Sequence, residues 1–425
     1  MPNTVAIVGG GAAGIMAALG ARREGARAVI YERNPRLGIK ILISGGGKCN
    51  ITHNAPPREL ENGFITREAR FLRHALHELS AAEMIEALER EGLETMTRPN
   101  GRVFPVSGRA EDVLAAFERM LERSGVIVRT RALVEDIVVT DGVARGIVVD
   151  GRREDADAVV IATGGLSYRK VGTTGDGIEW ARRLGLEITT VRAALAPLYF
   201  LQPPPADWQG VALRDVRTWI ECPGCAPDLV RLGLNTTWRD DILLTHRGLS
   251  GPATLEISRA AAYAREKHGD VYLLVDVVPD IDERELSRAW EERLASSGRS
   301  EVQSFVESYV PSALVDAILA ASGLARGVRI AVVTREQRRA LLSTLKRWEP
   351  GRPGEAPIDR GEVTAGGVAL SEVSPKTMQS RRIAGLYIAG EALDISGCIG
   401  GYNLQAAFST GYVAGREAAR MKEKG

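Results

Sequence analysis

The first 32 residues constrain the fold more than any other part of the sequence. Residues 4–8 (TVAIV) form a short apolar run rich in β-branched side chains, as expected for a buried parallel strand. The run ends in GGGAAG, which contains the pattern G-x-G-x-x-G, and residues 12–23 then predict a helix with small side chains facing a sheet. Residues 26–32 predict a second strand that ends at an acidic residue. This order predicts a Rossmann-type α/β domain.

Each part of this motif has a physical role in binding a dinucleotide. Gly9 permits the tight turn, Gly11 lets the backbone approach a pyrophosphate, and Gly14 lets the helix pack closely on the strand. The amino end of the helix offers free N–H groups and the positive end of its dipole to that phosphate. Glu32 can accept hydrogen bonds from an adenosine ribose and disfavours a 2′-phosphate there. The motif therefore favours FAD or NAD over NADP, and an ordinary glycine-rich loop is the alternative.

Later segments favour FAD over NAD. Residues 155–165 predict a strand that runs into Thr-Gly-Gly and returns the chain to the sheet beside the nucleotide. Near the C-terminus, a strand over 386–389 leads through glycine turns to a helix that begins near Asn403. The amino end of that helix would suit the pyrimidine end of a flavin, where negative charge develops on reduction. The alternative is that these C-terminal glycines serve helix packing alone.

Residues 43–54 (ISGGGKCNITHN) contain three glycines followed by a lysine, which suggests a phosphate-binding loop, but they do not match the P-loop pattern. A P-loop needs a glycine five residues before Gly47, where this chain has Leu42, and a hydroxyl after the lysine, where it has Cys49. These two mismatches remove the ATPase interpretation.

The pattern changes in the middle of the chain. A proline cluster is followed by β-type runs at 211–220, 241–244 and 271–278, and helical patterns then dominate from 282 to 347. This predicts an inserted substrate-covering unit within the FAD domain. We expect no separate NAD(P)H domain, because no second strand–GxGxxG–helix unit occurs, so NAD(P)H would have to reach the flavin through the open site.

Composition limits the partners and the cellular environment that we expect for this protein. Lys and Arg number 55 against 54 Asp and Glu, so the overall charge argues neither for nor against nucleic acid. No run approaches the roughly 18 apolar residues of a membrane span, no signal segment precedes the first strand, and four cysteines are too few for a disulfide scaffold. We therefore expect a reduced, cytoplasmic protein without a membrane partner.

Two smaller features have plain interpretations. Cys222 and Cys225 form one CxxC pair, which cannot complete a zinc site, and the Pro-Gly between them suggests a surface turn more than a redox motif. His74 and His77 lie three residues apart on a predicted helix without acidic or cysteine neighbours in the pattern. We expect solvated side chains there and no metal site in the chain.

Longer motifs resemble a known family. GIKILISGGGKCNITH together with GLYIAGEALDISGCIGGYNLQAAFSTG is similar to a bacterial FAD-flavoprotein family. Its members include aminoacetone oxidases, a flavoprotein of bile-acid dehydroxylation and a ribosomal-RNA dihydrouridine synthase. The resemblance continues through GRVFPVSGRAEDVL, ATGGLSYRKVGTTGDG, ILLTHRGLSGPA and VTAGGVALSEVSPKTMQSRRIAGLY, and so spans nearly the whole chain.

The resemblance implies a two-part FAD domain, residues 1–188 and 355–425, interrupted by a β-barrel-like and helical substrate region at 189–354. It lays the loop at 43–54 along the FAD diphosphate and ribityl chain. The FAD contacts that it implies are Gly9, Gly11, Ala12, Ala13, Gly14, Glu32, Arg33, Lys40, Ser44, Gly45, Gly46, Lys48, Cys49, Asn50, Val134, Thr163, Gly164, Gly390, Glu391, Asp394, Gly401, Tyr402, Asn403 and Leu404. Two positions depart from the family: Arg169 replaces a common proline, and Cys398 occupies a variable position.

The sequence favours an enzyme over a flavin-binding protein without turnover, because a flavin under an inserted cover is arranged for hydride exchange at N5. We expect a reductase that takes hydride from NAD(P)H and passes it to an activated carbon–carbon double bond. The neighbouring carbon then needs a proton, for which Cys49, Tyr168, Cys398 and Tyr402 are candidates.

Two other substrates stay open. One is an amine of the aminoacetone type, with oxygen as the electron acceptor, and the other is uridine in ribosomal RNA. An RNA substrate would find phosphate contacts most readily in the basic segment 335–347, although a solvated helix face is the simpler interpretation. Its basic residues are Arg335, Arg338, Arg339, Lys346 and Arg347.

Overall fold

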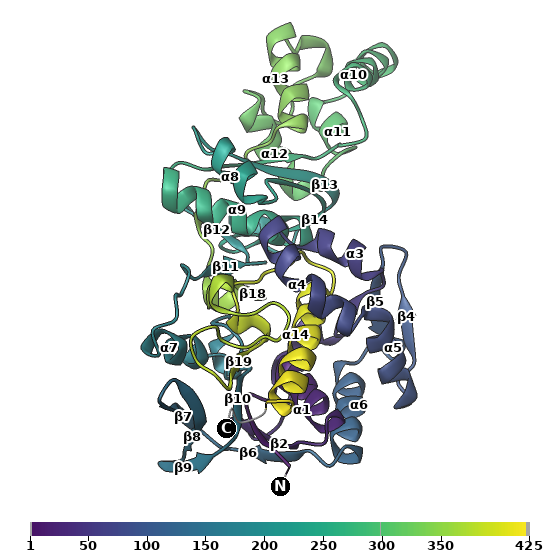
Figure 1. Cartoon of the computed structure of the whole chain (residues 1–425). Coiled ribbons are helices and arrows are strands. Elements are labelled where there is room, and N and C mark those ends of the chain that lie inside the picture. Colours follow the sequence, from purple (N-terminus) through teal and green to yellow (C-terminus); the bar gives the residue numbers. More distant parts are fainter. Residues whose placement is uncertain (1, 298, 422–425) are drawn as a thin grey trace. The chain divides into compact units, whose positions relative to one another are not determined.

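The computed structural model describes residues 2–297 and 299–421, which form two compact units (Figure 1). The first unit contains the residues up to 192 and those from 362 onward, and the second contains residues 193–361. The sequence had placed the insertion at 189–354. Each unit has its own hydrophobic core.

A parallel sheet of five strands forms the centre of the first unit. Its order is β19 (Leu386–Ile388), β10 (Ala158–Ile161), β1 (Thr4–Val8), β2 (Arg27–Glu32) and β6 (Ile127–Thr130). In β1, Ile7 is opposite Val160 on one side and Ile30 on the other, and all three are fully buried. Apolar residues without alternation suit a strand that is buried on both faces. The predicted α/β fold is confirmed.

Two helices from opposite ends of the chain pack on each other through glycines. These are α1 (Ala12–Arg23) and α14 (Tyr402–Ala419). A Cβ atom at Gly415 would stand 1.8 Å from the Ala17 carbonyl oxygen, and one at Gly411 would stand 2.1 Å from that of Ala13. The two backbones therefore lie in direct contact, which no larger residue at these positions would allow.

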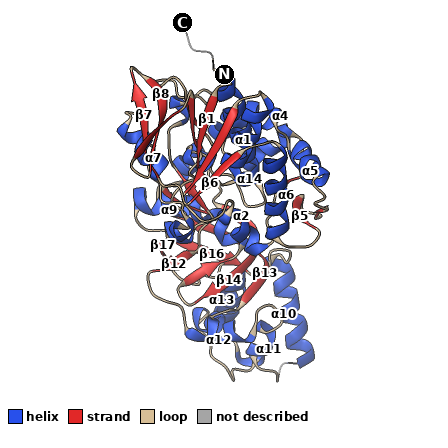
Figure 2. Cartoon of the chain, turned by 90° about the horizontal axis from the view of Figure 1, so that it is seen from below, coloured by secondary structure: helices blue, strands red, loops and turns tan. Residues whose placement is uncertain are grey.

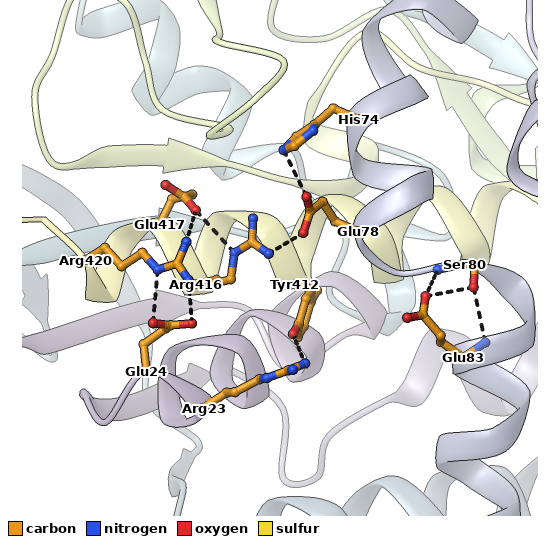
Figure 3. Close-up of polar contacts among 10 residues, drawn as sticks. All are labelled: Arg23, Glu24, His74, Glu78, Ser80, Glu83, Tyr412, Arg416, Glu417 and Arg420. Atoms are coloured by element: carbon orange, nitrogen blue, oxygen red, sulfur yellow. Dashed lines mark hydrogen bonds and ion pairs between the residues drawn. The ribbon is translucent and has the colours of Figure 1, made fainter.

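Ion pairs hold α14 from two sides (Figure 3). Arg416 pairs with Glu78 at the end of α4 (Thr66–Glu78), and Arg420 pairs with Glu24 just after α1 at 2.9 Å. Arg416 is the more enclosed of the two arginines, with 14% of its side chain exposed. These contacts join helices that are far apart in the sequence.

Smaller elements complete the first unit. The hairpin of β7 (Val134–Thr140) and β8 (Val143–Val149) turns at Asp141 and Gly142, whose φ angles of 50° and 73° suit the expected tight turn. β9 (Arg152–Asp155) extends this hairpin to three strands, and β3 (Thr52–His53), β5 (Arg102–Pro105) and β4 (Thr95–Thr97) form another antiparallel sheet. The other elements are α2 (Ile39–Ile43), η1 (Ser44–Gly47), α3 (Pro57–Leu60), η2 (Glu61–Gly63), α5 (Ala81–Arg90), α6 (Ala110–Arg123), η3 (Arg169–Val171), α7 (Asp176–Arg183), β18 (Val363–Ala365), η7 (Leu370–Glu372) and η8 (Gly390–Ala392).

The second unit is built on a six-stranded sheet whose neighbouring strands are antiparallel (Figure 2). Its order is β16 (Tyr272–Asp276), β13 (Ala212–Glu221), β14 (Thr237–Thr245), β15 (Gly248–Ser250), β12 (Leu198–Phe200) and β17 (Pro353–Glu355). The order is linear, so these described strands do not close into a complete barrel.

Helices make up the rest of the second unit, and those between 283 and 346 fall where the sequence predicted them. Trp290 and Phe305 pack edge to face in its core, with their ring centres 5.1 Å apart. The helices are α8 (Ala226–Leu232), α9 (Pro252–His268), α10 (Glu283–Ser297), α11 (Val302–Val306), α12 (Ser312–Ala321) and α13 (Arg335–Lys346), with the short turns η4 (Ala206–Trp208), η5 (Ile330–Val332) and η6 (Ile358–Arg360). A further short strand, β11 (Arg192–Ala194), lies where the chain passes from the residues of the first unit to those of the second. None of the helices in the described part of either unit is long and apolar enough to cross a membrane.

The CxxC pair forms the expected surface turn and is also cross-linked. Cys222 and Cys225 are joined in a disulfide, and Cys225 is buried at the start of α8. The Pro-Gly turn between them, with a φ of 74° at Gly224, brings the two Cα atoms to 5.7 Å, within disulfide reach. Pro223 and Gly224 are exposed, so the expected surface turn is present, and the disulfide that closes it was not predicted.

Candidate functional site

The glycine turn after β1 is closed on one side and open on the other. A Cβ atom at Gly14 would stand 1.8 Å from the Gly9 carbonyl oxygen, and one at Gly9 would stand 2.5 Å from the Ala162 carbonyl oxygen. At Gly11, which precedes α1, a Cβ atom would meet nothing within 4 Å. The turn thus packs tightly against the sheet, while the amino end of α1 has room for a ligand to approach.

Glu32 is fixed at the end of β2 beside this turn. One carboxylate oxygen accepts from the Gly10 N–H at 2.7 Å, and the other accepts from the Asn34 N–H at 2.8 Å. The side chain is buried. Its neighbour Arg33 points elsewhere and donates to Asp176 at 2.8 Å. Of these two predicted FAD contacts, Glu32 is therefore positioned at the glycine turn and Arg33 is tied to the start of α7.

The hydroxyl group of Thr163 has no hydrogen-bond partner within the described residues. It follows β10 at the carboxyl end of the sheet, and its Cα atom lies 3.1 Å from where a Cβ atom on Gly9 would stand. Its hydroxyl is buried. The hydroxyl oxygen itself lies 2.3 Å from where a Cβ atom on Gly177 would stand, at the start of α7 (Asp176–Arg183). A buried hydroxyl without a partner is costly, so this group between the glycine turn and α7 fits a site for a polar ligand.

Lys40 and Glu391, both predicted FAD contacts, form an ion pair. The Lys40 Nζ lies 2.5 Å from one Glu391 oxygen and 2.7 Å from the Ser167 hydroxyl. Burial alone would raise the pKa of Glu391, but the Lys40 charge and the hydrogen bonds from Lys40 and Thr364 together hold it below its usual value. Nearby, burial raises the pKa of Glu362, although Lys40 and Arg102 oppose the shift.

The loop at 43–54 is built from left-handed glycines. Gly45, Gly46 and Gly47 have φ angles of 57°, 67° and 83°, a region that glycine adopts without strain. A Cβ atom at Gly46 would meet nothing within 4 Å, so the backbone there is open to a ligand. Lys48 is exposed, and the Ser44 hydroxyl donates to the Ile41 carbonyl at 2.7 Å.

Cys49 lies beneath this loop and has no exposed surface. Burial raises the pKa of its thiol to about 11, and a hydrogen bond with Ser44 opposes the shift only partly. A buried neutral thiol behaves as a small apolar side chain. A packing role therefore suits Cys49 better than its candidate role as a proton donor.

The C-terminal segment meets the same loop. Asn50, with its amide nitrogen toward the carbonyl oxygens of Thr52 and Val103, accepts from the Gly401 N–H, each at 3.1 Å. The ring of Tyr402, the first residue of α14, stacks on His53 with centres 4.8 Å apart. The two glycine-rich segments that the sequence analysis assigned to a flavin site are therefore adjacent.

Polar contacts also fix the segment between β19 and α14. Asp394 is buried and pairs with Arg67 at 2.6 Å, and its other oxygen accepts from the Gly366 N–H at 3.1 Å. The Asn403 amide both accepts from the Gly397 N–H at 2.7 Å and donates to the Gly397 carbonyl at 2.9 Å.

The remaining predicted positions have varied surroundings. Ala12 and Ala13 lie in the first turn of α1, Gly390 donates to the Thr410 hydroxyl at 3.0 Å, and Val134 is buried at the start of β7. Gly164 (φ 75°) and Tyr168 (φ 56°) both have left-handed backbones, while Cys398 and Leu404 are half-buried.

The basic residues of the segment 335–347 do not form a free cationic face. Three of the five pair with carboxylates: Lys346 with Asp276 at 2.7 Å, Arg347 with Glu221 at 2.5 Å, and Arg338 with Glu291. Arg335 and Arg339 are exposed. Pairing lowers the electrostatic attraction that this segment could offer to RNA phosphates.

His74 and His77, which the sequence analysis expected to be solvated, lie on α4. His74 Nε2 is 3.8 Å from Glu78 (Figure 3), so His74 does have an acidic neighbour, contrary to the expectation from sequence. His77 Nδ1 contacts the Arg73 carbonyl oxygen at 2.8 Å. Within residues 2–297 and 299–421, no three His, Cys, Asp or Glu side chains are grouped so that they could hold a metal ion.

Comparison with known proteins decides the family. The sequence matches the family described as "HI0933-like protein Rossmann domain" over residues 3–417. The chain belongs to this family.

Two relatives of the HI0933-like chain align over almost its entire length. The 3-dehydro-bile acid delta(4,6)-reductase of Clostridium scindens is 32% identical over 98% of this chain and 99% of the relative. The ribosomal RNA dihydrouridine synthase of Escherichia coli is 29% identical over 98% of each. The family and its flavoprotein members make this chain an FAD-dependent oxidoreductase with a Rossmann domain.

A solved structure supports the fold. The 3-ketosteroid delta1-dehydrogenase from Sterolibacterium denitrificans, in complex with 1,4-androstadiene-3,17-dione, aligns with a TM-score of 0.54 at 15% identity. The alignment covers 99% of this chain and 100% of that one. At such low identity the likeness concerns the fold alone.

Sequence reasoning missed Ser167 and Thr364 as members of the site. Both are fully buried and contact Glu391. Their only signal was their place inside the family-like motifs ATGGLSYRKVGTTGDG and VTAGGVALSEVSPKTMQSRRIAGLY, which does not tell a site residue from a packing residue.

Proposed function

We propose that this HI0933-like protein is a reductase that uses NAD(P)H to saturate an activated carbon–carbon double bond. The observation that carries the proposal is the 32% identity with the bile-acid reductase over 98% of this chain. The E. coli relative also has a name that denotes a reduction, since dihydrouridine is uridine with its ring double bond saturated. The two relatives differ in substrate but share this reaction class, which makes the class a safer inference than either substrate.

The chain's own residues support FAD binding at the carboxyl ends of the parallel strands. The open backbone at Gly11 and the amino end of α1 would receive the pyrophosphate, Glu32 the adenosine ribose, and the Thr163 hydroxyl a polar atom of the nucleotide. The other contacts implied by the resemblance, among them Gly46 and Lys48, are proposed on the same basis. When bound, FAD supplies hydride exchange at N5 between NAD(P)H and the substrate.

The overall reaction adds one hydride and one proton across the double bond and converts NAD(P)H to NAD(P)+. The hydride goes to one carbon of the activated bond, and the proton goes to its neighbour. Of the four candidate donors, Cys49 is the poorest because its thiol is buried. Tyr168, Cys398 and Tyr402 are therefore the proposed donors, and Tyr402 has the best-defined position, at the start of α14 against His53.

A second candidate, the reduction of uridine in ribosomal RNA, is favoured by the 29% identity with the E. coli synthase over 98% of each chain. The neutral overall charge and the paired basic residues of segment 335–347 weigh against it. We therefore rank a small conjugated substrate first.

Anaerobic spectroscopy tests the proposal. The purified protein should be yellow, and its flavin absorbance near 450 nm should bleach with NADH or NADPH and return when a 3-oxo steroid with conjugated double bonds is added. The matched control is the same steroid with those double bonds saturated, which should not restore the colour. A flavin that neither nicotinamide reduces would contradict the proposal.

Other outcomes point to the alternatives. Bleaching by aminoacetone alone, followed by peroxide on admitting oxygen, would indicate an oxidase. Loss of dihydrouridine from ribosomal RNA in a deletion strain, restored by the wild-type gene, would indicate the RNA substrate. A flavin that stays oxidised with every donor would indicate a binding protein without turnover.

A further inference from the structure

We propose that Ser167 is a positioning residue that holds the Lys40 ammonium against Glu391 at the FAD site. The inference rests on the proposed FAD contacts and goes beyond them, because it assigns a role to a residue that is not among those contacts.

The Ser167 hydroxyl completes a closed ring of hydrogen bonds. It accepts from Lys40 Nζ at 2.7 Å and donates to Glu391 Oε1 at 2.9 Å, while Lys40 Nζ reaches Glu391 Oε2 at 2.5 Å. Ser167 has no exposed surface, and the side chains of Lys40 and Glu391 are 26% and 17% exposed. An ion pair this enclosed is stable only if its remaining donors and acceptors are satisfied.

Thr364 fixes the serine itself. Its hydroxyl oxygen accepts from the N–H groups of Leu166 and Ser167 at 2.8 Å and 3.1 Å, and its own N–H donates to Glu391 Oε1 at 2.8 Å. The ring therefore joins four segments: α2, the loop after β10, β18 and η8. Since each hydrogen bond depends on the others' geometry, loss of the serine hydroxyl would free Lys40 to move.

The position of the ring relates it to the cofactor. Glu391 follows β19 by three residues and Ser167 follows β10 by six, so both lie at the carboxyl ends of neighbouring parallel strands, where doubly wound sheets bind their ligands. Gly38, just before α2, donates to the Gly10 carbonyl at 2.9 Å, which links the Lys40 helix directly to the glycine turn.

The ring leaves Lys40 one donor to give to a ligand. An ammonium group has three N–H donors, and Ser167 and Glu391 take two of them. Within residues 2–297 and 299–421 no other group accepts from Lys40 Nζ, so the third donor would be free for an acceptor atom of FAD, and the held charge would favour the negative charge that reduction places on the flavin. Ser167 thus sets where that cation stands.

Two measurements on the FAD-loaded protein test this role, and neither needs NAD(P)H or substrate. Ser167→Ala should weaken FAD binding about tenfold or more, as expected for loss of hydrogen bonds to charged groups. It should also lower the flavin midpoint potential, because Lys40 no longer stands at its position. Ser167→Thr, which keeps the hydroxyl, should restore the potential toward the wild-type value.

A matched control separates positioning from general loss of stability. Ser380 is also buried in the first unit, and its hydroxyl accepts from the Arg382 and Ile383 N–H groups, each at 3.2 Å. Its N–H donates to the carbonyl of Leu386, the first residue of β19, at 2.7 Å, so it lies at the amino end of that strand, away from Glu391. Ser380→Ala should leave FAD affinity and midpoint potential unchanged even if it lowers the melting temperature.

The inference is overturned if Ser167→Ala binds FAD with unchanged affinity and potential. If that variant does not fold, Lys40→Met decides: it should lower both affinity and potential, and unchanged values would equally overturn the inference. Because these readouts concern FAD alone, a protein that fails to reduce any double bond would still test the role of Ser167.

Discussion

The carbonyl oxygen of Gly9 lies 1.8 Å from the place that a Cβ atom on residue 14 would occupy. That oxygen belongs to the backbone of the glycine turn and cannot rotate away as a side chain could. Gly14→Ala should therefore displace α1 from β1, lower the free energy of unfolding by about 3 kcal/mol and abolish FAD binding. Urea unfolding and flavin retention measure the two effects.

Gly11→Ala is the matched variant. Gly11 has a φ of −84°, which alanine adopts readily, and an added methyl group would meet no protein atom within 4 Å. The apoprotein should keep its stability within about 0.5 kcal/mol. Its FAD affinity should nevertheless fall at least tenfold, because the methyl group points into the space proposed for the pyrophosphate. Unchanged affinity would argue against a pyrophosphate at this turn.

The Arg416–Glu78 pair predicts an acid-sensitive contribution to stability. The hydrogen bond from Arg416 lowers the pKa of Glu78 below 4.5, and burial opposes the shift. A lowered pKa means that the stabilisation is present above pH 4.5 and is lost as the pH falls through the lowered value. Glu78→Gln should cost about 1 kcal/mol at pH 7 and nothing in acid.

An exposed ion pair supplies the comparison for Glu78. Glu86 and Arg90 pair on α5 with side chains 61% and 68% exposed. Glu86→Gln should change the free energy of unfolding by a few tenths of a kcal/mol at most. Equal effects of the two substitutions would mean that the enclosed position of Arg416 adds nothing.

The Cys49 thiol should not react with alkylating reagents in the folded protein. Burial raises its thiol pKa to about 11, so at pH 8 the thiolate that reacts with iodoacetamide is scarce as well as inaccessible. Mass spectrometry should find Cys49 unmodified in the native protein and fully modified after denaturation. Cys49→Ala should keep FAD and turnover; loss of turnover with FAD retained would restore it as a proton donor.

A pH dependence of stability opposite to that of Glu78 is predicted by the raised pKa of Glu362. Burial raises its pKa, so folding favours the protonated form and the benefit is lost as the pH rises from 4.5 through the raised value. Glu362→Gln, a permanent mimic of the protonated acid, should therefore make the apoprotein more stable than wild type at pH 8 but not at pH 4. The expected gain is about 1.4 kcal/mol for each unit by which the pKa is raised. A gain that is the same at both pH values would rule out the titration of Glu362 as its cause.

The nucleotide-binding part of the fold could be predicted because its signals are local. The strand at 4–8 and the helix at 12–23 coincide with β1 and α1, and the C-terminal strand and helix differ from prediction by a single residue. A buried parallel strand, a glycine turn and a small-residue helix each leave a pattern within a few positions.

The parts that could not be predicted depend on contacts between distant residues. The ring of Lys40, Ser167 and Glu391 joins residues up to 351 positions apart. The hydrophobic periodicity of a sequence carries no information about contacts at such separations. The Cys222–Cys225 disulfide was missed for another reason. The small number of cysteines argued for reduced thiols. The sequence Cys-Pro-Gly-Cys alone does not reveal the turn geometry that brings the two sulfur atoms together.

The glycine contact between α1 and α14 has a consequence for how the protein is made. α1 leaves the ribosome well before the helix that covers it and the strand β19 that completes one edge of its sheet, because these two come from residues 386–419. The nucleotide-binding unit therefore cannot finish folding until these residues have been synthesised. Its early half must wait, with apolar surface uncovered, while the whole insertion is synthesised, and this interval is when the nascent chain would most need a chaperone.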